Sequence, residues 1–296
     1  ASRNKSDLNI LESGLFFRLD ASNVIKKNIA SVIMPIGMDH KDFLKKGTID
    51  EIIYEKCSCL LEDSKIIVAE QKEKILNKIN ENIVKNSSLK FFFGKDYEYK
   101  KSMNGFIYKD TKGTIDLSQP NLLGDFQISN ISTAINTVRN LEQFNISEKH
   151  IKKAITKIRS EGRLQIINRG KLKKYLPKNS QILIVDGAHN PLAATAVNKY
   201  LTTFYNKKKV IMIIGMMANK EHKKFIQIFK KTVHSIITLD IPNQTNFIKK
   251  ESLSKIIKSC GIPTTTENSV NSALKKIGKK NSDVVIFCTG SLYLAG

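Results

Sequence analysis

The sequence lacks tryptophan, and polar residues interrupt every hydrophobic run before it reaches the length of a membrane span. Residues 1–7 lack the apolar core of a signal peptide. Cysteine is scarce, and its one close pair, Cys57 and Cys59, is separated by a single residue, which is poor spacing for zinc. We therefore expect a cytoplasmic protein with reduced thiols, no membrane anchor and no structural zinc.

Acidic residues are also under-represented, which leaves a formal net charge of +22 and a pI of about 9.7. Nucleic-acid binding is one interpretation of such a charge. However, the lysines are scattered, and aromatic residues do not alternate with them as base stacking would require. We favour a compositional origin, in which AT-rich coding enriches Lys, Ile and Asn, and keep nucleic-acid binding as the weaker alternative. A basic surface would still attract anionic substrates.

Apolar patterns alternate between strand and helix along the chain. Strands are expected at 30–36, 65–69 and 89–93, with helices at 48–60, 70–85, 127–142 and 147–159. After Arg163, further strands are expected at 181–185, 209–214, 235–239 and 284–289, with helices between them. This alternation predicts an α/β protein with mostly parallel sheets. We place the domain boundary at the Glu161-Gly162-Arg163 junction, which gives domains of residues 1–160 and 161–296.

The most informative segment is Asp186-Gly187-Ala188-His189-Asn190-Pro191. It follows an apolar strand pattern and precedes a helical one, and Asn190 and Pro191 suit the cap and the first position of that helix. Ligands of open α/β sheets bind at the carboxyl ends of strands, and a helix start favours phosphate. An ordinary connection between a strand and a helix would have the same residues, so the segment alone does not decide between a structural turn and a phosphate-binding turn.

Other motifs accompany this turn in a fixed order. They are Glu12 to Asn23, Gly37-Met38-Asp39-His40, Glu55-Lys56, Leu122 to Gln127 with Asn130, Gly162-Arg163-Leu164-Gln165, Asp186 to Pro191, Gly215 to Glu221, and Thr289 to Gly296. In this order and spacing the sequence resembles the folylpolyglutamate synthase/dihydrofolate synthase family of Mur-ligase-like enzymes. The resemblance runs from about residue 10 to the last residue. It implies an incomplete P-loop-type central domain that binds ATP, followed by a Rossmann-like C-terminal domain.

The resemblance also implies a reaction. ATP would phosphorylate a carboxylate of dihydropteroate or of a folate glutamyl tail, and the amine of L-glutamate would then attack the acyl phosphate. Such chemistry needs Mg²⁺, positioned donors for the nucleotide, and a site that excludes water. The sequence leaves the choice between dihydrofolate and folylpolyglutamate synthesis open.

Site residues follow from the match to the family motifs. Glu12 and His40 match metal ligands, and Lys56 matches a lysine that looks carbamylated in the family. Asn130, Arg163 and Asp186 match ATP contacts, and Lys56 and His189 are the candidate catalytic residues. Residues near the substrate are expected to be Leu19, Asp20, Ala21 and Ser291.

Several positions depart from the family pattern. No segment matches the P-loop Gly-Thr-Asn-Gly-Lys-Gly-Ser, so we expect a chain that starts downstream of it, with an exposed sheet edge and little ligase activity alone. Phe16 and Phe17 stand where the family has two glycines, and Phe126 stands for a usual histidine. A non-catalytic remnant, or one subunit of a split enzyme with a separate P-loop-bearing chain, is the alternative interpretation.

Overall fold

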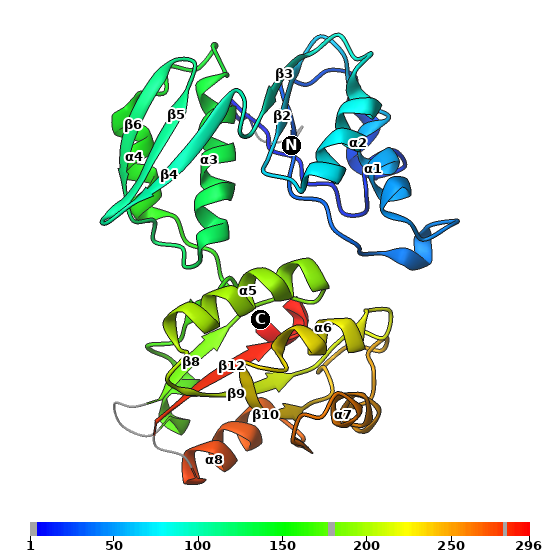
Figure 1. Cartoon of the computed structure of the whole chain (residues 1–296), viewed down its shortest axis with the longest axis vertical. Helices are drawn as coiled ribbons and strands as arrows, with labels where there is room; N and C mark the ends of the chain where they lie inside the picture. The colour runs from blue at the N-terminus through cyan, green and yellow to red at the C-terminus, as the bar shows by residue number, and fades with distance from the viewer. Residues whose placement is uncertain (1–4, 177–180, 281–282) are drawn as a thin grey trace. The chain divides into compact units, whose positions relative to one another are not determined.

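The computed structural model describes residues 5–176, 181–280 and 283–296, and these divide into two compact units (Figure 1). Unit 1 comprises residues 1–117 and 129–152, and unit 2 comprises residues 118–128 and 153–296. The divisions between these units fall after residues 117, 128 and 152, and the domain boundary expected at residue 160 stays a prediction. No helix among the described residues is long and apolar enough to cross a membrane.

Unit 2 is built on a six-stranded sheet with the order β11-β10-β9-β12-β8-β7. Neighbouring strands run parallel, except that β7 is antiparallel to β8. The strands are β7 (Gln165–Ile166), β8 (Ile182–Val185), β9 (Lys209–Ile214), β10 (Val233–Thr238), β11 (Thr264–Thr266) and β12 (Val284–Thr289). The central strands are buried on both faces, which explains their continuous Ile and Val runs.

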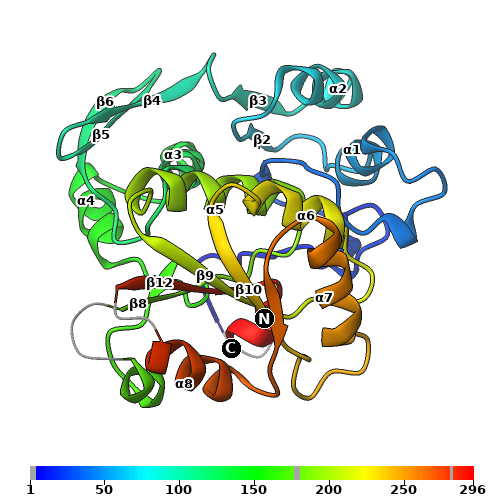
Figure 2. The same cartoon turned by 60° about the horizontal axis from the view of Figure 1, so that its bottom comes forward.

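Helices cover both faces of this sheet, which gives three layers (Figures 1 and 2). One face packs against α5 (Pro191–Phe204), α6 (His222–Phe229) and α7 (Lys250–Ser259). The other packs against α8 (Val270–Lys280), α9 (Leu292–Ala295) and the 3-10 helix η3 (Lys171–Tyr175). Alternate residues of β9 serve the two cores: Met212 and Ile214 face the first layer, and Ile211 and Ile213 face the second.

In unit 1, a parallel sheet has the order β1-β2-β3, with strands β1 (Ser31–Ile33), β2 (Lys65–Val68) and β3 (Leu89–Phe92). Helices α1 (Ile49–Cys57) and α2 (Glu73–Ile83) pack on one face through an isoleucine-rich core. The 3-10 helices η1 (Ala21–Val24) and η2 (Lys41–Phe43) lie in the loops around this sheet. Strand β1 is an edge strand, and Val32 on it is 41% exposed.

The second part of unit 1 is an antiparallel sheet, which the sequence patterns did not predict. Its strands are β4 (Tyr97–Ser102), β5 (Gly105–Asp110) and β6 (Gly113–Ser118), in the order β4-β5-β6. They are short and amphipathic, with lysines and turn residues that mask the strand signal. The helices that follow are α3 (Asp125–Arg139) and α4 (Glu148–Lys157).

A buried ion pair joins this sheet to α3. Arg139 donates from Nε and Nη2 to the two carboxylate oxygens of Asp110, at 2.7 and 3.1 Å. The Asp110 side chain is only 2% exposed, and it also accepts a hydrogen bond from Tyr108, which in turn accepts one from Asn136. Because both charges are shielded from water, removing either one would leave the other buried without a counter-charge.

Segment 118–128 groups with unit 2 because its residues pack there. Asn121 bonds the main chain of Ile155 and Ile158, and the ring of Phe126 packs against the first core layer of unit 2. Gly124, with φ +96°, makes room for that ring, since a Cβ there would lie 2.5 Å from it. Phe126, which departs from the family pattern, is thus a packing residue.

We predict that Asp110→Ala lowers the free energy of unfolding by about 3–5 kcal/mol, because it leaves the Arg139 guanidinium buried without a counter-charge. Urea denaturation followed by circular dichroism measures the change. Asp116→Ala, at an exposed position of β6, is the matched control and should stay within about 0.5 kcal/mol of the parent. Equal effects of the two substitutions would contradict the prediction.

Candidate functional site

The turn after β8 is organised by the carboxylate of Asp186. Its Oδ2 accepts the N–H of Leu164 at 2.8 Å, and its Oδ1 accepts the N–H of Ala188 at 2.7 Å. The residue is 3% exposed. Burial raises the pKa of Asp186, although these two donors and the charges of Arg163 and His189 oppose the rise. Asp186 therefore ties the 162–164 loop to the β8–α5 turn instead of facing solvent.

The main chain of the two segments is packed closely around this carboxylate. Gly187 donates to the carbonyl of Gly162 at 2.8 Å, and Gly290 donates to that of Ala188 at 2.9 Å. A Cβ on Gly187 would lie 2.2 Å from Leu292 Cδ2 and 3.1 Å from Arg163 Nη1. A side chain at position 187 would therefore displace Leu292, and the guanidinium of Arg163 lies close over the turn.

The start of α5 completes the group of Arg163, Asp186 and His189, which we call the half-site. Asn190 caps the helix by accepting the N–H of Ala193, and Pro191 occupies its first turn. His189 Nδ1 lies 2.9 Å from the carbonyl of Gly187, which can only accept, so the ring proton belongs on Nδ1. Arg163 is exposed. The structure thus brings Arg163, Asp186 and His189 together at the carboxyl end of β8.

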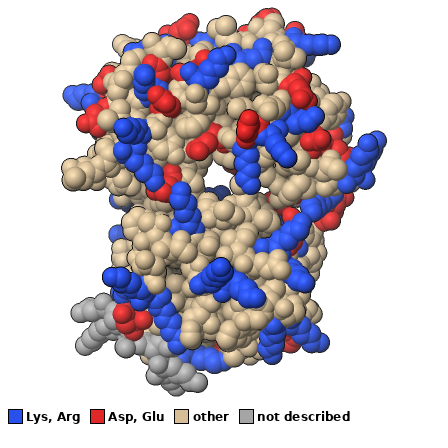
Figure 3. Space-filling model, in the orientation of Figure 1, with Lys and Arg blue, Asp and Glu red and all other residues tan. Residues whose placement is uncertain are grey.

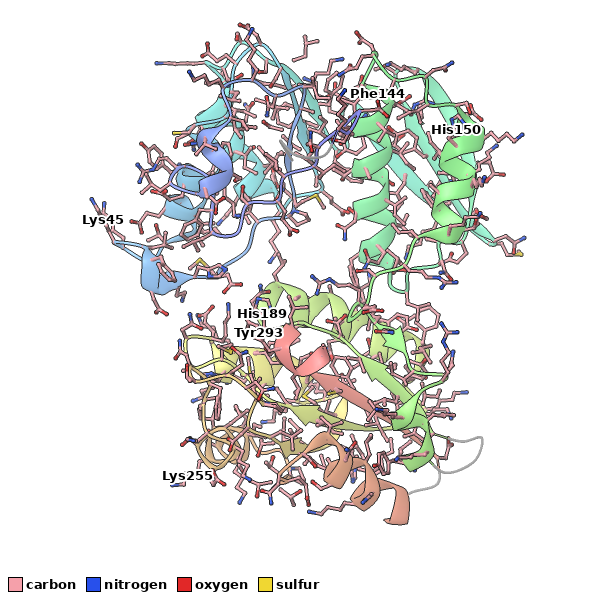
Figure 4. All side chains as sticks on the ribbon, turned by 180° about the vertical axis from the view of Figure 1, so that it is seen from behind. Lys45, Phe144, His150, His189, Lys255 and Tyr293 are labelled. Atoms are coloured by element: carbon pink, nitrogen blue, oxygen red, sulfur yellow. The ribbon has the colours of Figure 1, made fainter. Side chains whose placement is uncertain are left out.

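Ser291 lies beside this turn, at the end of β12. Its hydroxyl accepts the N–H of Tyr293 at 3.1 Å and caps the short helix α9, and the residue is 3% exposed. Figure 4 labels His189 and Tyr293, which come from the two neighbouring strand ends. Ser291 is a structural cap in this arrangement, and its expected contact with substrate stays a prediction.

In unit 1 the loop before β1 is tied to α1. Arg18 donates from Nε and Nη2 to the carboxylate of Glu55, with distances from 2.7 to 3.0 Å, and its N–H donates to the Glu55 carbonyl. Asp20 accepts the N–H groups of Leu15 and Ser22 and the Ser22 hydroxyl. These hydrogen bonds lower the pKa of Asp20 to about 2. Leu19, between them, is 81% exposed, and Ala21 is also exposed.

Phe16 is the centre of a small cluster in the same loop. It is buried, yet its φ is +56°, a left-handed conformation that favours glycine. The His40 ring meets its ring edge-on at 6.1 Å between centroids, and Lys56 Nζ lies 5.9 Å from its centroid. Burial lowers the pKa of Lys56, against the opposing effects of Cys57, Asp39 and Asp20. Thus His40 and Lys56 contact one aromatic ring.

The donor groups around this cluster are few for a metal. His40 Nε2 lies 4.0 Å from Asp39 Oδ2, and Glu12 is exposed in an irregular segment. Among the residues described, no three His, Cys, Asp or Glu side chains are grouped so that they could hold an ion. These residues could supply one or two ligands to a magnesium ion, and phosphate oxygens and water molecules would have to supply the remaining ligands.

The remaining predicted residue, Asn130, lies on α3 and is partly buried in unit 1. Two positions that organise the turn of unit 2 escaped the sequence analysis as functional positions. They are Leu164, which has φ +45°, and Leu292, which closes over Gly187. A leucine in a sequence gives no indication that it organises a turn, whereas the motif that contains Gly187 indicated a turn at that position.

Comparisons with known proteins find relatives of this chain. Residues 162–292 match the family model described as Mur ligase, glutamate ligase domain. The chain is 25% identical over 298 residues to a probable dihydrofolate synthetase of Schizosaccharomyces pombe, covering 97% of this chain and 69% of that protein. The chain is a homologue of the folylpolyglutamate/dihydrofolate synthases.

Solved synthase structures have the same fold. Escherichia coli FolC in complex with DHPP and ADP gives a TM-score of 0.81 at 22% identity, over 96% of this chain and 63% of that one. The bifunctional synthase of Yersinia pestis complexed with AMPPNP and Mn ion gives 0.79 at 19%, again over 96% and 63%. The chain therefore spans less than two thirds of the length of these synthases.

We predict that Asp186→Asn lowers the free energy of unfolding by about 1–3 kcal/mol. An amide offers one acceptor where the turn supplies two N–H donors, so one buried donor loses its partner. Urea denaturation measures the loss, and hydrogen exchange should show faster exchange at the Leu164 or Ala188 amide. Glu161→Gln, an exposed neighbour on the same loop, should change neither. Unchanged exchange at both amides would contradict the role assigned to Asp186.

Phe16 allows a test of the strained backbone. Phe16→Gly and Phe16→Ala both remove the ring and cost about 3–5 kcal/mol. At an ordinary position alanine is the more stable of the two by about 0.5–1 kcal/mol, whereas at φ +56° glycine should be more stable by about 1 kcal/mol. Urea denaturation of both variants gives the order. Alanine above glycine would show that the left-handed conformation is absent in solution.

Proposed function

We propose that this chain contributes to an ATP-dependent ligase that joins L-glutamate to dihydropteroate or to a folate glutamyl tail. The observation that carries the proposal is the turn after β8, where a buried carboxylate holds Arg163 and His189 at the start of a capped helix. A helix start with an arginine beside it suits a phosphate group. Homology to synthases solved with ADP and AMPPNP supports a nucleotide as the ligand.

The proposed roles are divided between the two units. In unit 2, Arg163 would bind nucleotide phosphate, Asp186 would position the turn, and His189 would lie next to the reacting groups. In unit 1, Asn130 would contact the nucleotide, and the exposed segment from Leu19 to Ala21 would contact the pterin substrate. Ser291 would contact glutamate through its hydroxyl hydrogen, since its oxygen already caps α9.

A divalent metal, Mg²⁺ by preference, would lie at Glu12 and His40 and be shared with phosphate oxygens. It would neutralise phosphate charge while the γ-phosphoryl group moves from ATP to the substrate carboxylate. The chain's own contribution is to orient the phosphates through Arg163 and to hold the substrate loop through the Arg18–Glu55 pair. Glutamate nitrogen then attacks the acyl carbon, phosphate leaves, and an amide forms.

The proposal predicts that ADP binds to the chain and that Arg163→Ala weakens binding by about tenfold or more, the value of one charge-assisted hydrogen bond. Isothermal titration calorimetry measures the affinity. Arg169→Ala, at another exposed arginine in unit 2, is the matched control and should bind as the parent does. Equal affinities of the two variants, or no ADP binding by the parent, would contradict the proposal.

The ligase reaction itself is distinguished by its dependence on glutamate. With ATP, Mg²⁺ and dihydropteroate or tetrahydrofolate, a ligase releases phosphate and forms an amide only when L-glutamate is added. Phosphate release that is the same without L-glutamate would point to hydrolysis of ATP instead.

A further inference from the structure

A basic hollow lies in unit 2 at the opposite end of the sheet from Asp186. It is formed where β9 and β10 begin and where the chain approaches β11, whereas the Asp186 turn follows the carboxyl end of β8. Its volume is about 520 Å³, which is large enough for a chain of phosphate groups. The proposed ligase function makes no use of it.

Lysines from two separate segments line this hollow. Lys208 and Lys209 come from the start of β9, and Lys230 and Lys231 come from the end of α6. His234 of β10 joins them. No Asp, Glu, Phe, Tyr or Trp side chain is among the described residues that line it. The hollow therefore gathers positive charge locally, although over the face shown in Figure 3 Lys and Arg are spread across both units.

The turn at Gly261 forms one wall of the hollow. Gly261 has φ +80°, and a Cβ there would lie 3.8 Å from Lys230 Nζ, so the ammonium group extends over this turn. The absence of a side chain on Gly261 leaves the wall to main-chain atoms. Together with Ile262 and Pro263 it gives the hollow a rigid, uncharged side.

Neighbouring groups neutralise part of the positive charge of these lysines. Lys208 donates to Asp283, which neutralises one ammonium group. Helices α6 and α7 both end beside the hollow, and each contributes roughly half a negative charge. The four lysines nevertheless make the lining basic, and no Asp or Glu is among the described residues that line the hollow. An anion with several charges is the complement of such a place.

We propose that this hollow binds the phosphate chain of an oligophosphate, whether free or as the tail of a nucleotide, without contact to a base. Lysine ammonium groups act as point charges that suit phosphate oxygens. Among the described residues that line the hollow, the His234 imidazole is the only aromatic ring, so we expect a base to add little to the binding. Tripolyphosphate and ATP should therefore bind here with similar affinity.

The test is calorimetric titration of the chain with sodium tripolyphosphate and, separately, with ATP, both without divalent metal. It uses the Arg163→Ala background, so that the nucleotide half-site contributes little. We expect saturable one-to-one binding of both ligands, and the double variant Lys230→Gln/Lys231→Gln should lose about tenfold or more in affinity.

The matched control is Lys223→Gln/Lys255→Gln, which removes the same net charge from exposed positions on α6 and α7 outside the hollow. Lys255 is labelled in Figure 4. At physiological salt, screening should keep its effect within about twofold. Equal losses in both double variants would show diffuse attraction and overturn the proposal.

Two further outcomes would also overturn it. One is the absence of saturable tripolyphosphate binding, and the other is ATP binding that is much tighter than tripolyphosphate binding and depends on Lys230 and Lys231. Neither outcome affects the Arg163-dependent binding of ADP, so the proposal for the hollow and the proposed ligase function are tested separately.

Discussion

The turn at the carboxyl end of β8 depends on one buried carboxylate. Asp186 accepts two main-chain N–H groups that lie on different segments, Leu164 and Ala188, and so closes the loop onto the strand end. A neutral or longer side chain could not satisfy both donors in the same space. The main-chain bonds from Gly187 to Gly162 and from Gly290 to Ala188 reinforce this closure, and Gly187 there lies close to Leu292 and Arg163.

The loop of unit 1 is held in a different way. Its charged contacts lie near the surface, in the Arg18–Glu55 pair and in the Asp20 turn, and the buried contact is the aromatic ring of Phe16. A phenylalanine at φ +56° stores backbone strain, which the burial of its ring offsets. As a consequence of this packing, His40 and Lys56 contact the ring of Phe16, whereas a glycine at position 16 would leave open space beside them.

Strands and helices were largely predictable because the parallel sheets are buried on both faces and carry long apolar runs. The antiparallel strands β4 to β6 were missed, since many of their residues are exposed and polar, with lysines in β4 and β5 and Thr and Asp in β6. At the site, the sequence indicated that Asp186 and His189 follow a strand, where the structure has them, whereas it did not show that Arg163 lies over the same turn; the roles of all three stay predictions. It could not show that the carboxylate is used by the main chain, because that depends on Leu164, a residue type without polar chemistry.

The two ends of the unit 2 sheet differ in how they present positive charge. At the carboxyl end, Arg163 lies over a glycine turn and beside a helix start, where its planar donors define a direction for a phosphate. At the amino end, two helices finish, and only flexible lysines supply charge. The first arrangement favours one oriented ligand, whereas the second favours an anion chosen by its charge. A parallel sheet produces this difference, because every helix that starts at one edge must finish at the other.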